Sequence, residues 1–160
     1  MAKPTAYLET TFVSYLVARP ARDVIITALQ QMTRAWWERR RNSYELRISD
    51  RVIREASVGD AEMVRKRLEK LRPITVLPAT DEALKLAKLI VKATGIPPKA
   101  AEDAIHIAVA ATHGIDYLVT WNCKHLANAH VIRRVGILFA DQALKCPVIC
   151  TPQELMENEP

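Results

Sequence analysis

Three acidic residues and one amide are the side chains of this sequence with the most specific chemistry: Glu9, Glu55, Asp103 and Asn122. Each lies at a junction of strand or helix that the sequence pattern predicts. If the fold brings these junctions together, the side-chain oxygens form a pocket of the kind that holds Mg²⁺ or Mn²⁺. Such an ion favours hydrolysis of a phosphodiester, because it binds the phosphate oxygens and activates a water near neutral pH.

Two hydroxyl side chains, Thr11 and Thr120, lie close in sequence to this set and are suited to orienting a carboxylate or a metal-bound water. Each acid also has a purely structural interpretation. Glu9 fits an exposed strand end, Glu55 a surface helix residue, and Asp103 a favourable charge in the first turns of a helix. Spacing alone therefore leaves both interpretations open.

The elements that must position these residues are short apolar strands alternating with helices. Strands are expected at residues 5–9, 44–48, 74–77, 117–120 and 148–150. Helices are expected at residues 12–17, 23–41, 50–57, 60–72, 80–94, 99–113, 128–135 with an extension to 145 left open, and 152–156. This alternation predicts an α/β fold of three layers, with a largely parallel central sheet flanked by helices.

Ligands of an open parallel sheet bind beyond the carboxyl ends of its strands, because loops and helix starts converge there. Glu9 closes the first expected strand, and Asn122 lies just past the fourth. Glu55 belongs to the helix after the second strand, and Asp103 lies about one turn into the helix that leads to the fourth. We therefore expect all four near one edge of the sheet.

Length and composition place the chain among ordinary globular proteins. Its 160 residues, 49% hydrophobic and 26% charged, fit a single domain over residues 1–160. A chain of this size buries roughly two thirds of its unfolded surface without disulfides or metals. Apolar stretches are interrupted within about ten residues, too short for a bilayer core of ~30 Å. With no secretory signal at the N-terminus, we expect a cytoplasmic protein and no membrane partner.

The three cysteines are an odd count that fits a reducing compartment, and we expect them to be reduced and structural. Cys123 lies near His125, but this pair lacks the second ligand pair of a zinc site. Core or surface roles are expected for the four histidines, which are His106, His113, His125 and His130. The four glycines form no phosphate-binding loop, which argues against a nucleotide cofactor held by one.

The net charge of +5 is permissive for polyanions but not diagnostic, since composition alone favours balanced, solvated helix faces as its explanation. A dense basic stretch, Arg39, Arg40 and Arg41, follows Trp37. An aromatic ring beside arginines suits stacking on an RNA base, so these four are candidate RNA-binding residues. An interface or a partly covered surface is an equal alternative for Trp37.

The sequence resembles the PIN domain family, the fold of the VapC-type toxin ribonucleases. Four segments carry the resemblance in order, at residues 7–11, 48–55, 103–108 and 118–122, so it spans nearly the whole chain. The resemblance implies a metal-dependent endoribonuclease that cuts single-stranded RNA with water as the nucleophile. It also implies, for toxin members, a homodimer that a small antitoxin protein silences.

Carried over by position, the resemblance implies that Glu9, Glu55 and Asp103 are the ligands of Mg²⁺ or Mn²⁺. Thr11 and Thr120 would then be the supporting hydroxyls. Glu9 departs from the usual Asp by one additional methylene, which shifts the carboxylate without removing it.

At Asn122 the family usually has Asp. An amide carries no charge to hold a cation, although its oxygen can still ligate one. Two functions therefore remain open. One is a catalytic set that includes Asn122 in the toxin of a toxin–antitoxin pair, and the other is a PIN-like module that binds RNA or protein with weakened or no nuclease activity. A phosphoacceptor receiver domain is disfavoured, because two threonines follow Glu9 where it needs an acid pair.

Overall fold

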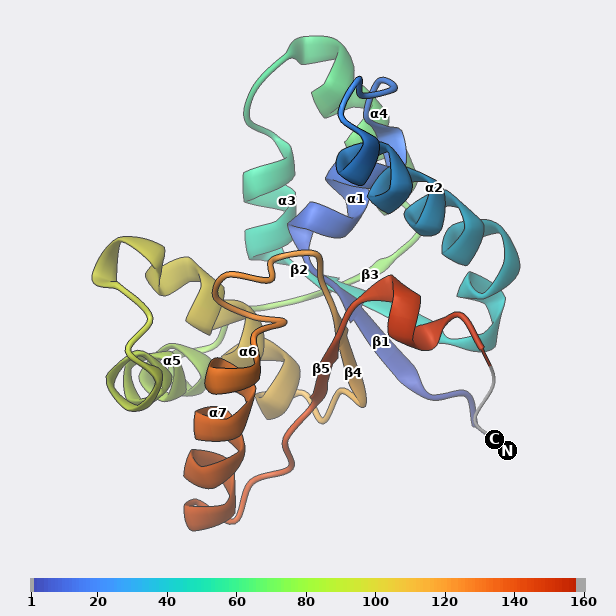
Figure 1. The fold of residues 1–160 in the computed structure, drawn as a ribbon. Helices are drawn as coiled ribbons and strands as arrows, with labels where there is room; N and C mark the ends of the chain where they lie inside the picture. The colour runs from blue at the N-terminus through green and yellow to red at the C-terminus, as the bar shows by residue number, and fades with distance from the viewer. Residues whose placement is uncertain (1, 158–160) are drawn as a thin grey trace.

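The computed structural model describes residues 2–157, and these form one five-stranded parallel sheet in the order β3-β2-β1-β4-β5 (Figure 1). The strands are β1 (Thr5–Leu8), β2 (Glu45–Ser49), β3 (Thr75–Leu77), β4 (Tyr117–Val119) and β5 (Val148–Cys150). Helices α1 to α4 pack together on one side of the sheet, and α5 to α7 on the other. The predicted α/β fold with a parallel central sheet flanked by helices is confirmed.

The helices begin and end close to the predicted positions. They are α1 (Thr10–Val17), α2 (Val24–Arg39), α3 (Asp50–Ala56), α4 (Ala61–Leu71), α5 (Asp81–Thr94), α6 (Ala101–Thr112) and α7 (Ala129–Asp141), with 3-10 turns η1 (Arg41–Ser43), η2 (Pro98–Ala100) and η3 (Pro152–Leu155). Ser49, Asp60 and Thr80 each accept a backbone N–H at a helix start, as their residue types predict. One difference is that residues 152–155 form a 3-10 turn, whereas α7 continues to Asp141, within the extension that the sequence left open.

The order of the strands reverses between β1 and β4. From β1 the chain builds outward through β2 to β3, then crosses to β4 and continues to β5. Leu8 is paired with Val119. The next residues, Glu9 and Thr120, therefore lie next to each other just beyond the ends of the two central strands. Such a reversal opens a crevice at the carboxyl ends of the two strands, and it is where ligands of parallel sheets bind.

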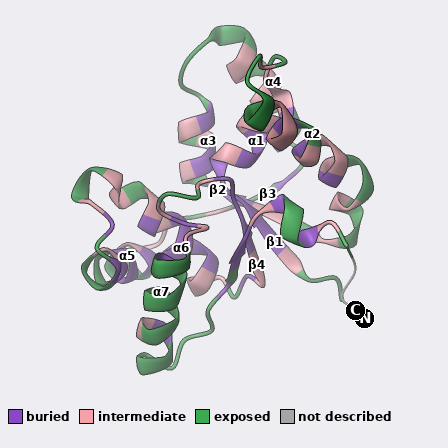
Figure 2. Ribbon diagram, in the orientation of Figure 1, coloured by how far each residue is buried: buried purple, intermediate pink, exposed green. Residues whose placement is uncertain are grey.

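The core lies along the two central strands and under the helices, as the burial colouring shows (Figure 2). Tyr7 and Leu118 are fully buried on β1 and β4, which anchors the strands that lead into the crevice. Trp36 is also fully buried and meets Phe12 edge to face at 5.3 Å between ring centroids. Within residues 2–157, no helix is long and apolar enough to cross a membrane.

Candidate metal centre

Glu9 is held in place at the crevice by two threonines. It directly follows β1, its side chain caps α1, and only 2% of the residue is exposed. The Oε2 atom accepts hydrogen bonds from the Thr11 N–H at 3.1 Å, the Thr11 hydroxyl, and the Thr120 hydroxyl at 2.8 Å. These are the two hydroxyls expected to support the site. Burial raises the pKa of Glu9, although the charge of His106 and these hydrogen bonds act in the opposite direction.

Glu55 reaches the same crevice from α3 and contacts His106 of α6. The distance from Glu55 Oε1 to His106 Nε2 is 2.6 Å, and the imidazole is fully buried. The other ring nitrogen, Nδ1, lies 2.6 Å from the Tyr7 hydroxyl, which in turn lies 2.7 Å from the Ser49 hydroxyl. Burial alone would lower the pKa of His106, but the contact with Glu55 and the charge of Glu9 raise it above its usual value.

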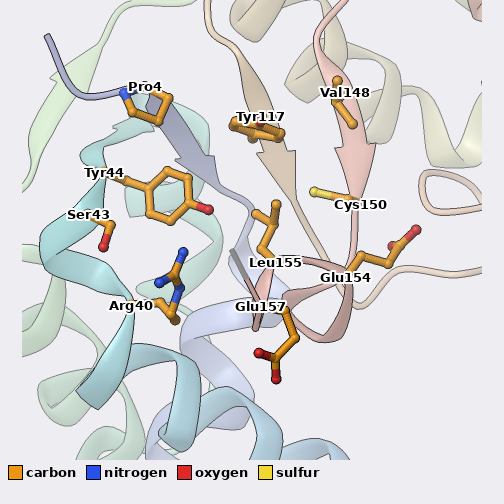
Figure 3. A pocket seen from close by; sticks show the side chains of 10 residues that line it. All are labelled: Pro4, Arg40, Ser43, Tyr44, Tyr117, Val148, Cys150, Glu154, Leu155 and Glu157. Atoms are coloured by element: carbon orange, nitrogen blue, oxygen red, sulfur yellow. The ribbon is translucent and has the colours of Figure 1, made fainter. Parts of the chain in front are cut away.

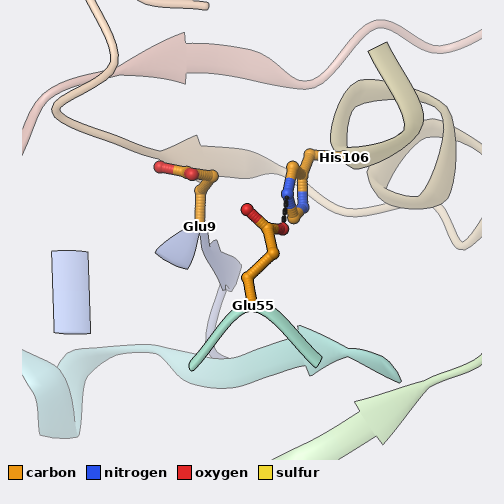
Figure 4. A group of neighbouring side chains, drawn as sticks. All are labelled: Glu9, Glu55 and His106. Atoms are coloured by element: carbon orange, nitrogen blue, oxygen red, sulfur yellow. Dashed lines mark hydrogen bonds and ion pairs between the residues drawn. The ribbon is translucent and has the colours of Figure 1, made fainter. Parts of the chain in front are cut away.

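Glu9, Glu55 and His106 form a compact group of potential metal ligands (Figure 4). Each offers one ligand atom, and these atoms lie within 4.8 Å of one another. Among the ion pairs formed by residues 2–157, none involves the Glu9 carboxylate, although it is almost wholly buried. A buried carboxylate without a paired cation is costly, and a divalent ion offsets that cost. The two carboxylates, Glu9 and Glu55, therefore fit a divalent cation.

The other two predicted residues lie nearby but outside this compact group. Asp103 is in the first turn of α6, and its Oδ2 atom lies 2.8 Å from His125 Nδ1. Asn122 follows β4, and its Oδ1 atom accepts the backbone N–H of His125 at 3.0 Å. Asn122 thus caps the turn that carries His125, and His125 contacts Asp103. Asp103 precedes His106 by three residues on α6, so the two residues share a face of the helix.

The sequence reasoning assigned structural roles to two histidines that lie in the site. His106 is a core residue, as expected, but it also contacts Glu55. Its position three residues after Asp103 on one helix was a usable signal, because residues at this spacing share a face. The role of His125 had no such signal, since it depends on the path of the loop after β4. The role of Tyr7 had no sequence signal either, because its hydroxyl contacts His106 on α6, 99 residues away in the chain.

The candidate RNA-binding residues lie near the amino ends of the strands, whereas the acidic group lies at the carboxyl ends. The Arg41 guanidinium stacks at 5.1 Å over the Trp37 ring, and the Lys70 ammonium lies 5.8 Å from it. Both Trp37 and Arg41 line a groove of about 360 Å³ beside the amino ends of β2 and β3. Arg39 ends α2, and Arg40 caps its last turn. The fold thus does not bring these residues to the acidic group, and their binding of RNA stays a prediction.

A second cavity, of about 730 Å³, also opens near the amino ends of the strands (Figure 3). Its walls include Pro4 before β1, Tyr117 at the start of β4 and Val148 at the start of β5. Arg40 and Leu155 approach it from α2 and η3. The cavity is larger than the groove beside Trp37, but it contains no member of the acidic group. Neither of these two concavities therefore includes the candidate metal ligands.

A parallel sheet whose strand order reverses beside neighbouring carboxylates defines an α/β domain with a candidate metal site at the carboxyl ends of its central strands. The sequence model of the family described as PIN domain matches residues 6–126 of this chain. The chain therefore belongs to the PIN domain family, whose members are generally nucleases. The matched range contains Glu9, Glu55, Asp103 and Asn122.

A solved structure supports the fold independently. The crystal structure of VapBC2 from Rickettsia felis bound to a DNA fragment from their promoter contains a chain that is similar to this one, with a TM-score of 0.56 and 12% sequence identity. The similarity covers 92% of this chain and 98% of that chain. None of the curated protein sequences matches.

Proposed function

We propose that this protein is a divalent-metal-dependent endoribonuclease that cleaves single-stranded RNA and acts as the toxin of a toxin–antitoxin pair. The observation that carries the proposal is the convergence of Glu9 and Glu55 within one small group at the β1–β4 crevice of a PIN domain. We assign Glu9, Glu55 and Asp103 as ligands of Mg²⁺ or Mn²⁺, and Asn122 as a neighbour that completes the catalytic set.

The residues of the chain have distinct parts in this proposal. Thr11 and Thr120 hold Oε2 of Glu9 and so fix the direction of its carboxylate. The Asp103 carboxylate lies within reach of His125, which competes with a cation for Oδ2. A bound divalent ion supplies a positive centre for the phosphate oxygens and a more acidic water.

Incubation of the purified protein with single-stranded RNA and Mn²⁺ or Mg²⁺ tests the proposal. We expect cleavage that EDTA abolishes and that Asp103→Asn strongly reduces. Cleavage that survives both controls would assign the activity to another site or to a contaminant. A failure of the wild-type protein to cleave any of several unrelated RNAs would reject the nuclease assignment.

A second candidate function is a PIN-like module that binds RNA or a protein without cutting. The observation that favours it is the engagement of Asn122 Oδ1 with the His125 N–H, a structural role for the residue that usually supplies an acid. Under this alternative, calorimetry shows no binding of divalent ions, while RNA still binds with an affinity that falls as salt rises. Binding of Mn²⁺ by the wild-type protein would contradict it.

The partners and extent of the protein are part of the same proposal. A small antitoxin is supported by the similarity of the fold to VapBC2, and an acidic segment in the product of an adjacent gene would complement the net charge of +5. We also propose a cytoplasmic homodimer, which light scattering of the purified protein tests. A single domain over residues 1–160 is supported by β5, which pairs with β4 although it lies beyond the matched range of 6–126.

A further inference from the structure

We infer that His106 is a positioning residue, which Tyr7 anchors and which holds the Glu55 carboxylate toward Glu9. The inference rests on the proposed metal-dependent function and adds a residue to it. Four side chains in a continuous series of contacts carry it: Ser49 to Tyr7, Tyr7 to His106, and His106 to Glu55, at 2.7, 2.6 and 2.6 Å.

The direction of these hydrogen bonds follows from the chemistry of the groups. An ionised carboxylate accepts hydrogen bonds and cannot donate, so the proton in the contact with Glu55 belongs to His106 Nε2. In the neutral imidazole, Nδ1 then accepts from the Tyr7 hydroxyl, and the Tyr7 oxygen accepts from Ser49. In the charged imidazole, Nδ1 donates to Tyr7 instead. In both states Nε2 donates to Glu55, so the tether does not depend on the protonation of the ring.

The elements that carry these residues explain what the tether fixes. Tyr7 lies two residues before Glu9 on β1, so the strand that carries the first carboxylate also anchors the imidazole. Ser49, at the far end of the series, also caps α3, the helix that carries Glu55. The series therefore closes a loop between β1, α6 and α3, and it sets the position of the Glu55 carboxylate relative to Glu9.

The side chain of Glu55 needs such a tether more than that of Glu9 does. It is 36% exposed, whereas Glu9 is 2% exposed and receives hydrogen bonds from two threonines. A long, partly exposed carboxylate has several accessible rotamers, and each must be given up when it ligates a cation. A donor on a fully buried ring selects one of them in advance.

The geometry separates this role from that of a direct ligand. A ligating Nε2 must be free of its proton and must release Glu55. Instead, both ring nitrogens are engaged, and the Nε2 proton points at the carboxylate. Histidines that support a site in this way change metal affinity or activity by about 10- to 100-fold when replaced.

Two amide substitutions of His106 separate the role from simple core packing. In His106→Gln the amide N–H reaches the place of Nε2 and can still donate to Glu55, whereas in His106→Asn the shorter amide lies near Nδ1 and faces Tyr7. We expect His106→Asn to bind Mn²⁺ about 10- to 100-fold more weakly than the wild type and to cleave RNA correspondingly more slowly. His106→Gln should keep most of both activities, at a similar melting temperature for the two variants.

Tyr7→Phe removes the hydroxyl that contacts His106 and leaves the aromatic ring in place. Tyr44→Phe, at the amino end of β2, is its matched control. We expect weaker Mn²⁺ binding for Tyr7→Phe and no change for Tyr44→Phe. If both His106 variants fail to fold, this pair decides the question, since Tyr7→Phe removes a single oxygen atom. Unchanged Mn²⁺ affinity in Tyr7→Phe would then reject the inference.

Pulsed electron paramagnetic resonance of the Mn²⁺ complex provides the remaining readout. A coupling of Mn²⁺ to a directly coordinated nitrogen that is present in the wild type and lost in His106→Gln would show that His106 is a ligand. We expect no such coupling, and its observation would overturn the inference. Equal affinities of the wild type, His106→Asn and Tyr7→Phe would overturn it as well. Wild-type protein that binds Mn²⁺ without cleaving RNA rejects the nuclease proposal and leaves the comparison of affinities valid. Wild-type protein that binds no Mn²⁺ rejects both.

Discussion

Two carboxylate–histidine pairs lie beside the same crevice, and they differ in how the rest of the molecule supports them. The Glu55–His106 pair is linked to the sheet through Tyr7 and has a fully buried imidazole. The Asp103–His125 pair has both side chains slightly exposed, at 18% and 16%, and its histidine belongs to the loop after β4. The distances are alike, 2.6 and 2.8 Å, so the difference lies in the support and not in the contact.

This difference suggests different parts for the two pairs. A pair held by buried groups on regular elements keeps one geometry, which suits the permanent part of a metal site. A pair held by a loop can separate at little cost, because loops open locally more easily than core elements. We therefore expect Asp103 to exchange His125 for a cation, whereas Glu55 keeps its contact with His106.

The largest effects should come from removing the charge of each acid in turn. Glu55→Gln and Asp103→Asn should each reduce the rate of RNA cleavage by about 100-fold or more, because each removes a negative ligand rather than a supporting group. Initial rates at saturating Mn²⁺ measure this. Asp116→Asn is a matched control, since Asp116 pairs with Lys145 and Thr5 at the amino end of β1. Full activity in Asp103→Asn would remove the Asp103–His125 pair from the site.

Stability should separate the two histidines next. His106→Ala should lower the free energy of unfolding by about 2–4 kcal/mol, because it leaves a cavity and removes the partner of a buried hydroxyl. His125→Ala should lower it by about 1 kcal/mol, since the loop can rearrange around the gap. Urea denaturation in the presence of EDTA measures both. Similar losses for the two variants would show that the loop pair is as firmly supported as the buried one.

A pH series tests Glu9, the buried carboxylate that is grouped with the Glu55–His106 pair. Because the pKa of Glu9 is raised in the folded protein, the folded state binds its proton more tightly than the unfolded state does. The metal-free protein should therefore lose stability as the pH rises from the ordinary value of 4.5 through the raised pKa. Glu9→Gln stays neutral throughout, so it should become the more stable of the two over this range.

Added Mn²⁺ should reverse that order, because an ion that binds the folded wild type stabilises it in proportion to the logarithm of its concentration. Glu9→Gln should gain much less stability from added Mn²⁺, because it lacks the negative charge of the proposed ligand. Denaturation curves at several pH values, with and without Mn²⁺, measure both effects. A pH-independent difference between wild type and Glu9→Gln would mean that the Glu9 carboxyl is not perturbed by its burial.

The fold and part of the site follow from the sequence for identifiable reasons. Alternating strands and helices predict the parallel sheet, and the first and fourth strands then place Glu9 and Thr120 at adjacent carboxyl ends. Helix caps such as Ser49 act through neighbours in sequence, which is why their positions were predictable.

The contacts that distinguish the two pairs do not follow from the sequence, because they join residues far apart in the chain. Tyr7 and His106 are 99 positions apart, and Asp103 and His125 are joined across the loop after β4. Their distances depend on how α6 packs against the sheet and on how the loop returns. The same limit applies to Trp37 and Arg41. Their residue types suit RNA, but the fold places them near the amino ends of the strands, away from the acidic group.

The smallest effect should come from Asn122, which determines how freely the loop pair can adjust. Asn122→Asp keeps the cap on the turn, because Asp accepts a backbone N–H as well as Asn does. It adds a negative charge next to His125, the partner of Asp103, so Mn²⁺ affinity should rise by a few-fold, less than about tenfold. Calorimetric titration with Mn²⁺ measures the gain.

Asn122→Ala is the matched control, because it removes the cap without adding charge and should cost about 1 kcal/mol of stability. A gain in affinity for Asn122→Asp together with unchanged affinity for Asn122→Ala would assign the effect to charge. Equal changes in the two variants would assign it to the position of His125. In that case the loop, and not the missing acid, limits how Asp103 reaches a cation.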